Sequence, residues 1–319
     1  MTPLSTLLKK YNLQPRKGLA QNFLADSIHL AKIIEAAELS RDDIVLEVGP
    51  GPGTLTQRLL QVAGQVIAVE LDPNMVNLLN HELGHLPNLT LIEADILQTD
   101  LKPLITAAEQ RLQFLQQAET RDRFTQDISS GLTASEKSKT QNLKLVLSEV
   151  EGSKISYKVI ANLPYYITSA ILRYLLEAVP QPERLVVTVQ KEVAQRIVAR
   201  PGAMSLLAVS VQFYGQASLM HYIPAGAFYP PPKVDSAVIR IDTYTHPPIV
   251  VSDVDHFFRV VKAGFGQKRK QLKNTLAAGL RRPTAEIVTT MSQVGLDPTR
   301  RAQTLSLAEW GRLAEVLLK

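Results

Sequence analysis

Cysteine is absent from this 319-residue chain. Without thiols the protein has no disulfide, no thiolate zinc site, no iron-sulfur cluster and no cysteine nucleophile. Only two of the six histidines, His81 and His85, stand at H-x-x-x-H spacing, and this single pair gives little support for a protein-bound metal, so we expect none.

Long apolar runs are also missing. No segment approaches the roughly 18 to 20 consecutive apolar residues that span a bilayer, and the N-terminal "MTPLSTLLKKYNLQPRKG" has no apolar core followed by a cleavage site. We therefore expect a cytoplasmic protein with no membrane partner. Hydrophobic residues still make up 45% of the chain, which is typical of a folded protein with room for one large domain and one small one.

Acidic residues are missing from one long stretch. The formal net charge is +5, and between His256 and Ala285 the chain has many basic residues but no Asp or Glu. A solvated helix face is the alternative reading of such a stretch, but solvated faces usually interleave acids. Because a polyanion is the natural partner of a basic block, we predict nucleic-acid binding here. The first contacts we expect are Lys268, Arg269, Lys270 and Lys273.

Short apolar, β-branched runs alternate with helical patterns and predict an α/β fold with a doubly wound, mostly parallel sheet. The expected strands begin at Ile44, Val66, Leu89, Tyr157 and Leu185. Two further runs, at 218–223 and 235–241, follow each other with no convincing helix between them, which suggests a hairpin added to the sheet edge.

Two boundaries are predicted from composition. Strand signals disappear after "THPPIV", so we expect one domain over residues 1–246 and a helical, RNA-binding domain over 247–319. Residues of about 106–156 are polar and too long for an ordinary crossover, which indicates an insertion that is at least partly flexible. A helix is possible in its first half, "AAEQRLQFLQQAETRDRF".

The first expected strand runs into a glycine-rich turn, "EVGPGPGT". Glycines such as Gly49 and Gly51 let the backbone turn tightly and approach a ligand at the start of a helix. The spacing is G-x-G-x-G, which weakens a dinucleotide interpretation, because the third glycine is not where a pyrophosphate site requires it. A plain tight turn remains the alternative for this motif alone.

Two acids end neighbouring strands. Glu70 ends the second expected strand, where a carboxylate accepts hydrogen bonds from ribose hydroxyls. Asp95 ends the third strand, where it is placed to accept from an adenine amino group. No phosphate-loop lysine accompanies them. We therefore predict that the ligand is an adenosine without phosphates, with S-adenosylmethionine as the candidate.

The fourth strand ends in Asn162-Leu163-Pro164-Tyr165. The Asn162 side-chain oxygen and the Leu163 carbonyl are suited to accept the two hydrogens of an adenine N6, Pro164 fixes the backbone, and Tyr165 offers a stacking face. Such chemistry depends mostly on positioning the amine against an electrophilic methyl group. A simple helix cap is the alternative interpretation, and the glycine turn and the two acids argue against it.

A base inside a helix cannot reach such a pocket, so the target must be single-stranded or flipped out. A second aromatic on the other face of the base would help to hold it. The loop "PAGAFYPPPKVDSAV" offers Phe228 or Tyr229 for this role, and an ordinary core aromatic is the equally weighted alternative.

In combination these segments resemble the ribosomal RNA adenine N6-dimethyltransferases, closest to the branch acting on small-subunit RNA. The resemblance covers nearly the whole chain except the insertion and includes "QNFL", "EVGPGPGTLT", "ELD", "EADIL", "NLPYYI", "QKEVAQRI", "AFYPPPKVDSAV", "FGQKRKQLKNTL" and "GLDPTRRAQTLS". It implies a seven-stranded class I, Rossmann-like methyltransferase sheet with a small all-helical C-terminal domain.

The resemblance also implies roles for individual residues. Asn22 and Leu24 would contact S-adenosylmethionine, with Gly49 near its methionine part, Glu70 at the ribose, Asp95 at the adenine and Asn162 at the reacting end. The implied reaction dimethylates two adjacent adenosines in a hairpin loop near the 3′ end of 16S rRNA, in a small-subunit (30S) precursor. We expect the enzyme to act as a monomer.

Three other functions compete with this one. The first is a relative that modifies one adenosine of large-subunit RNA, and the second is a protein that checks small-subunit assembly without using its chemistry. The third, a nicotinamide-dependent oxidoreductase, disagrees with the glycine spacing and with the Asn162–Tyr165 motif. The C-terminal motifs favour the small-subunit branch over the first.

Overall fold

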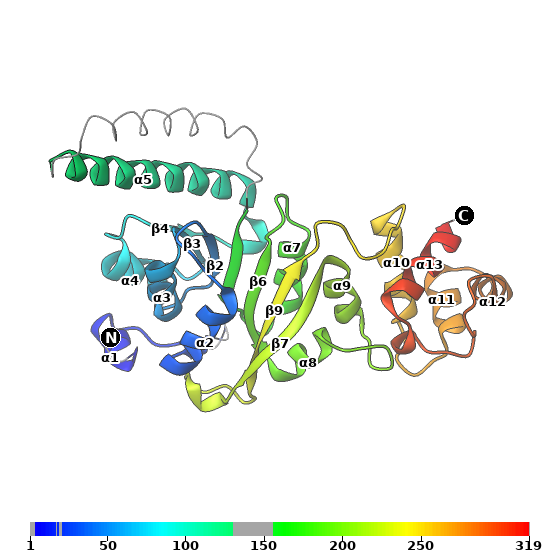
Figure 1. The fold of residues 1–319 in the computed structure, drawn as a ribbon. Coiled ribbons are helices and arrows are strands. Elements are labelled where there is room, and N and C mark those ends of the chain that lie inside the picture. Colours follow the sequence, from blue (N-terminus) through cyan, green and yellow to red (C-terminus); the bar gives the residue numbers. More distant parts are fainter. Residues whose placement is uncertain (1–3, 17, 19–20, 130–155, 319) are drawn as a thin grey trace.

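The computed structural model describes residues 4–16, 18, 21–129 and 156–318 of the chain. The fold is α/β. One mixed sheet of parallel and antiparallel strands forms the centre of the molecule, and the C-terminal helices form a group beside it (Figure 1). Within the described residues, no helix is both long and apolar enough to cross a membrane.

The central sheet has seven strands in the order β4-β3-β2-β5-β6-β9-β7. The five parallel strands are β2 (Ile44–Val48), β3 (Gln65–Glu70), β4 (Leu89–Glu93), β5 (Lys158–Asn162) and β6 (Arg184–Gln190). Each lies within a residue or two of its expected position. The structure therefore confirms the doubly wound, seven-stranded sheet.

The last two strands form the expected hairpin at the edge of the sheet. Strands β7 (Gly215–Ile223) and β9 (Ser236–Thr243) pair antiparallel, and β9 also pairs antiparallel with β6. The later strand of the hairpin is thus the inner one, and β7 is the edge strand of the sheet.

Helices cover both faces of the sheet because the inner strands are buried on both sides. One face packs against α2 (Ser27–Ala37), α3 (Thr54–Val62) and α4 (Pro73–Leu83) through a core that includes Val45, Val66 and Ile160. The other face packs against α5 (Leu101–Ser129), α7 (Thr168–Leu176) and α8 (Lys191–Ile197).

The predicted insertion begins inside helix α5. Ile105, Ala108 and Leu112 are buried against the sheet, so the first turns of α5 pack on it as the helix that follows β4. The same helix then continues to Ser129, which confirms the helix expected in this segment. The rest of the predicted insertion, 130–155, lies outside the described residues.

The C-terminal helices share a core with one helix of the sheet domain. Helices α10 (Val254–Gly264), α11 (Leu272–Leu280), α12 (Thr284–Gln293) and α13 (Leu307–Leu318) pack around Trp310 and Phe257. Helix α9 (Leu206–Tyr214) contributes Phe213 to the same core, and its ring lies 5.0 Å from that of Phe257. This shared packing fixes the C-terminal helices against the sheet.

A short ladder ties the N-terminal segment to the segment before β9. Strand β1 (Phe23–Leu24) pairs antiparallel with β8 (Phe228–Tyr229), with Phe23 opposite Tyr229 and Leu24 opposite Phe228. Before it, α1 (Leu4–Lys10) packs its leucines against Phe23 and against Met75 of α4. The ladder positions Gln21 and Asn22 beside the ends of the parallel strands.

Candidate active site

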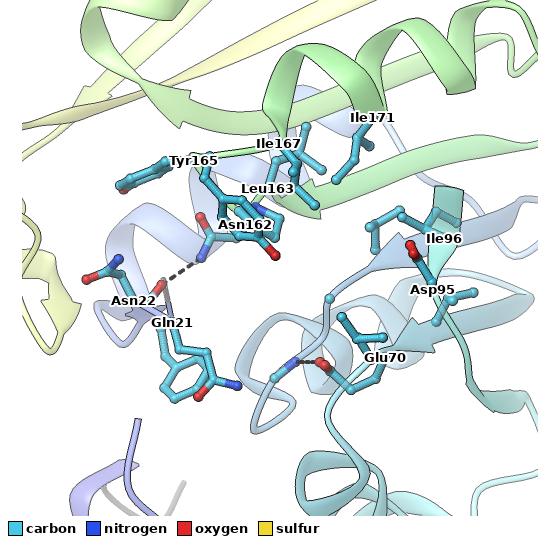
Figure 2. A pocket seen from close by; sticks show the side chains of 18 of the residues that line it. Gln21, Asn22, Glu70, Asp95, Ile96, Asn162, Leu163, Tyr165, Ile167 and Ile171 are labelled. Carbon is cyan, nitrogen blue, oxygen red and sulfur yellow. Dashed lines mark hydrogen bonds between the residues drawn. The ribbon is translucent and has the colours of Figure 1, made fainter. Parts of the chain in front are cut away.

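A pocket of about 770 Å³, its open mouth included, lies where four parallel strands end. In open α/β sheets the carboxyl ends of the strands are where ligands bind. Figure 2 shows Glu70 and Asp95 on one side of this space, with Asn162 and Tyr165 on the other. The polar lining residues are Gln21, Asn22, Glu70, Asp95 and Asn162, and the apolar ones include Val48, Val69, Ile96, Ile167 and Ile171.

The turn after β2 requires glycine for two separate reasons. Gly49 and Gly51 have φ angles of 65° and 55°, in the left-handed region that side chains disfavour. At Gly51 a Cβ atom would also lie 2.7 Å from Cε1 of Phe23, whose ring borders the pocket. The turn therefore brings bare backbone to the pocket wall.

Glu70 holds this turn in place. Its carboxylate accepts hydrogen bonds from the backbone N–H of Gly51 at 2.9 Å and from that of Asp72 at 2.8 Å. Burial raises the pKa of Glu70, and the two N–H donors act in the opposite direction. The carboxylate retains further acceptor capacity toward the pocket, since each oxygen has two lone pairs.

Two neighbouring acids begin helices. Asp95 lines the pocket and caps a short 3₁₀ turn, accepting from the N–H of Leu97 at 3.0 Å. Asp72 caps α4 and accepts from the Gln21 side chain at 3.1 Å. Asp72 thus orients Gln21, while Asp95 itself faces the ligand space.

The two polar atoms of the Asn162 side chain differ in their hydrogen bonding. Its Nδ2 donates to the Asn22 carbonyl at 2.9 Å (Figure 2). Its Oδ1 is buried, and no hydrogen-bond partner for it occurs in the described part of the chain. Because an unpaired buried acceptor costs about 1–3 kcal/mol, an N–H donor from a bound molecule is the natural partner of this oxygen.

Tyr165 is held as a wall of the same pocket. Its hydroxyl forms a 2.6 Å hydrogen bond with Ser236 Oγ, which connects the end of β5 to the start of β9. The backbone N–H of Leu163 donates to Thr188 of β6, and the Pro164 carbonyl accepts from the Thr168 hydroxyl. The whole Asn162–Tyr165 turn is therefore anchored on both sides.

The structure places two predicted site residues elsewhere. Phe228 is only 4% exposed and packs with Leu24 in the core under α2, because the β1–β8 ladder turns both side chains inward. Neither residue lines the pocket at the strand ends. Tyr229, the other aromatic considered for stacking, is 43% exposed.

The predicted RNA-binding residues lie away from the pocket, on the C-terminal helices. Lys268, Arg269 and Lys270 are exposed in the loop between α10 and α11, and Lys273 is half-buried in the first turn of α11.

Several lining residues were not predicted. Gln21 and Phe23 enter through the β1–β8 ladder, which has no long-range signal in the sequence. Ile167 and Ile171 lie one helical turn apart after the Asn162–Tyr165 motif, so the 3.6-residue period could have identified them.

Behind the glycine turn lies a buried acid, Glu47. It is 1% exposed, its Oε2 has no hydrogen-bond partner among the described residues, and burial raises its pKa to about 8. The folded protein therefore holds a proton here that the unfolded chain releases near its ordinary pKa of 4.5.

We expect Glu47→Gln to change the pH dependence of stability. The stabilisation from the protonated Glu47 carboxyl is complete below pH 4.5 and is lost as pH rises toward about 8. The variant carries no such titration, so its melting temperature should exceed that of the wild type by a growing margin, about 2–4 °C per kcal/mol, between pH 5 and pH 8. If the melting temperatures of the variant and the wild type differ by a constant amount from pH 5 to pH 8, Glu47 is not protonated in the folded protein.

Three features together define a class I methyltransferase: the sheet order, the glycine turn after β2, and the groups suited to adenosine after β3 and β4. A family model described as "Ribosomal RNA adenine dimethylase" matches residues 12–319. The chain therefore belongs to the ribosomal RNA adenine dimethylases.

Individual relatives agree with this assignment. The chain is 43% identical over 315 residues to "Ribosomal RNA small subunit methyltransferase A" of Dehalococcoides mccartyi strain CBDB1, covering 98% of this chain and 92% of the relative. Among solved structures it resembles the 23S rRNA methyltransferase ErmE, with TM-score 0.61, 25% identity and coverage of 93% and 100%. A dimethyladenosine transferase from Plasmodium falciparum shares the fold, with TM-score 0.64, 21% identity and coverage of 91% and 95%.

Proposed function

We propose that the protein transfers methyl groups from S-adenosylmethionine to N6 of two adjacent adenosines near the 3′ end of 16S rRNA. The target is a hairpin loop in a small-subunit precursor, and the enzyme acts as a monomer. Its catalytic domain spans 1–246 and its RNA-binding domain 247–319. The observation that carries the proposal is the buried Asn162 Oδ1, which has no hydrogen-bond partner among the described residues and lies in a pocket lined by Glu70 and Asp95.

The pocket suits the adenosine part of the methyl donor. Glu70 is positioned at the end of β3 to accept from ribose hydroxyls, and Asp95, two residues after β4, to accept from an adenine amino group. Ile96 beside Asp95 gives an apolar wall for the ring. Gly49 and Gly51, which lack side chains, leave room for the methionine part at the turn.

The bound donor supplies an electrophilic methyl group on a sulfonium. In each transfer the adenine N6 gains this methyl group and loses one proton, while the carbon–sulfur bond breaks. Asn162 Oδ1 accepts a hydrogen bond from N6–H and draws the lone pair out of conjugation with the ring. Tyr165 supports the base by stacking, which contributes about 1–3 kcal/mol per base.

The target adenosine must leave any helical stack to reach Asn162. Asn162 and Leu163 are at least partly enclosed by the Asn22 segment and by β6, so only an unpaired or flipped base fits. A hairpin loop supplies such bases with little energetic cost. This requirement is consistent with a single-stranded target and excludes paired adenosines.

Large-subunit RNA is the second candidate substrate, because the likeness to ErmE extends over 93% of the chain. The two candidates share the pocket, so only the RNA distinguishes them. We expect labelled methyl groups to enter 30S particles that lack the modification, with little incorporation into 23S rRNA. Preferential labelling of 23S rRNA would reverse the choice of substrate while leaving the reaction type in place.

A further inference from the structure

Asp72 is a buried carboxylate that no step of the proposed reaction uses. It is 1% exposed and caps α4, where its Oδ1 accepts a hydrogen bond from the N–H of Asn74 at 3.1 Å. A helix cap needs only one side-chain oxygen. The other oxygen, Oδ2, accepts instead from Nε2 of Gln21 at 3.1 Å. Half of this carboxylate therefore serves the N-terminal segment and not the helix.

Arg16 completes a closed network around this carboxylate. Its Nη1 lies 3.2 Å from Asp72 Oδ1, and its backbone N–H donates to Oε1 of Gln21 at 2.8 Å. Both polar atoms of the Gln21 side chain are thus engaged, one by Arg16 and one by Asp72. Hydrogen bonds to an ionised group are stronger than those between neutral groups. We call Arg16, Gln21 and Asp72 the Asp72 network.

The Asp72 network ends next to the amide that is assigned to the target base. Gln21 is followed by Asn22, whose carbonyl accepts from Asn162 Nδ2 at 2.9 Å (Figure 2). A carbonyl oxygen can only accept, so it binds the NH₂ group of Asn162 and disfavours the opposite orientation of the amide. The position of the Asn22 carbonyl therefore leaves Asn162 Oδ1 as the buried acceptor that has no partner in the described chain.

The same residue is also connected to the cofactor side of the pocket. The backbone N–H of Asp72 donates to Oε1 of Glu70 at 2.8 Å, and Glu70 is the acceptor proposed for the ribose. This bond uses only the backbone, so it persists whatever side chain stands at position 72. The backbone of Asp72 thus supports Glu70, whereas its side chain supports Gln21.

We propose that Asp72 is a positioning residue for methyl transfer, because through Gln21 it holds the Asn22 carbonyl that orients the Asn162 amide toward the adenine N6. The inference rests on the proposed function and adds the support behind its central residue. Asp72 does not line the pocket, so it acts only through its neighbours. Transfer depends on placing N6 in line with the methyl group, and small displacements are costly in such reactions.

The first test is Asp72→Asn, because asparagine caps a helix as well as aspartate does. An amide has one acceptor oxygen, so with that oxygen on the cap its NH₂ group meets the Gln21 Nε2 donor. We expect single-turnover transfer to 30S particles, with saturating enzyme and cofactor, to slow about 10- to 100-fold, with little change in melting temperature. The matched control is Glu82→Gln, whose carboxylate on α4 binds Lys10 of α1 at 2.6 Å, and it should keep the wild-type rate.

The second test exchanges donor and acceptor. Gln21→Glu alone places two carboxylates against each other and should also slow transfer. Asp72→Asn/Gln21→Glu restores a donor–acceptor pair with the original total charge, so most of the lost rate should return. Residues that do not act through one contact would show additive losses instead.

Two results would overturn the positioning role of Asp72: a wild-type rate in Asp72→Asn, or additive losses in the double variant. Either result, obtained while the wild type methylates 30S particles, refutes this inference alone. A wild type that does not methylate these particles refutes the proposed function, and this inference with it.

Discussion

We expect Asn162→Ala to lower the rate of methyl transfer about 10²- to 10³-fold, the usual cost of removing one group that stabilises a transition state. The substitution removes the one buried acceptor in the pocket that has no partner in the described structure. The measurement is single-turnover transfer of labelled methyl groups to 30S particles, with saturating enzyme and cofactor.

The fold should survive this substitution. Asn162 is the last residue of β5, and only its hydrogen bond to the Asn22 carbonyl is lost. Asn77→Ala, at an exposed position of α4, serves as the control and should retain the wild-type rate. A near-normal rate in Asn162→Ala would contradict the mechanism, because the Leu163 carbonyl alone would then be enough to hold N6.

Glu70→Ala should weaken binding of S-adenosylmethionine about 100-fold or more, as measured by calorimetry. The change removes the expected ribose acceptor and also leaves the N–H groups of Gly51 and Asp72 without their partner. An unsatisfied buried donor costs about 1–3 kcal/mol, so the melting temperature should fall as well.

Two controls separate binding from general damage to the sheet edge. Glu93→Ala removes an exposed carboxylate at the end of β4, beside the pocket but not lining it, and should leave the affinity unchanged. Glu70→Gln should still bind poorly, because an amide has only one acceptor oxygen for two N–H donors. Wild-type affinity in Glu70→Ala would refute the role assigned to this residue.

The strands were predictable because the parallel part of the sheet is buried on both faces. A strand in such a sheet must be apolar at consecutive positions, and "IVLEV" and "VIAVE" have that character even though each carries one acid. Glu70, Asp95 and Asn162 come at or just after the ends of three of these runs, so the sequence alone assigns them to one edge of the sheet. Their meeting in one pocket follows from parallel topology alone.

Contacts that depend on an irregular segment could not be predicted in the same way. Phe228 was considered for stacking on the base and Leu24 for contacting the cofactor, but the two-residue ladder between β1 and β8 turns both side chains into the core. Helix α5 is a second case. Its sequence is mostly polar, and the burial of Ile105 and Leu112 was not predicted, because a helix needs only one apolar stripe to pack on a sheet.

The central claim is that this pocket dimethylates adenosine in small-subunit RNA. The most direct test is nucleoside analysis, by mass spectrometry, of 16S rRNA from unmodified 30S particles incubated with the enzyme and S-adenosylmethionine. We predict N6,N6-dimethyladenosine at two adjacent positions near the 3′ end, and about 10²- to 10³-fold slower formation of it with Asn162→Ala. Recovery of only a monomethylated product, or of a methyl group on any atom other than N6, would contradict the account.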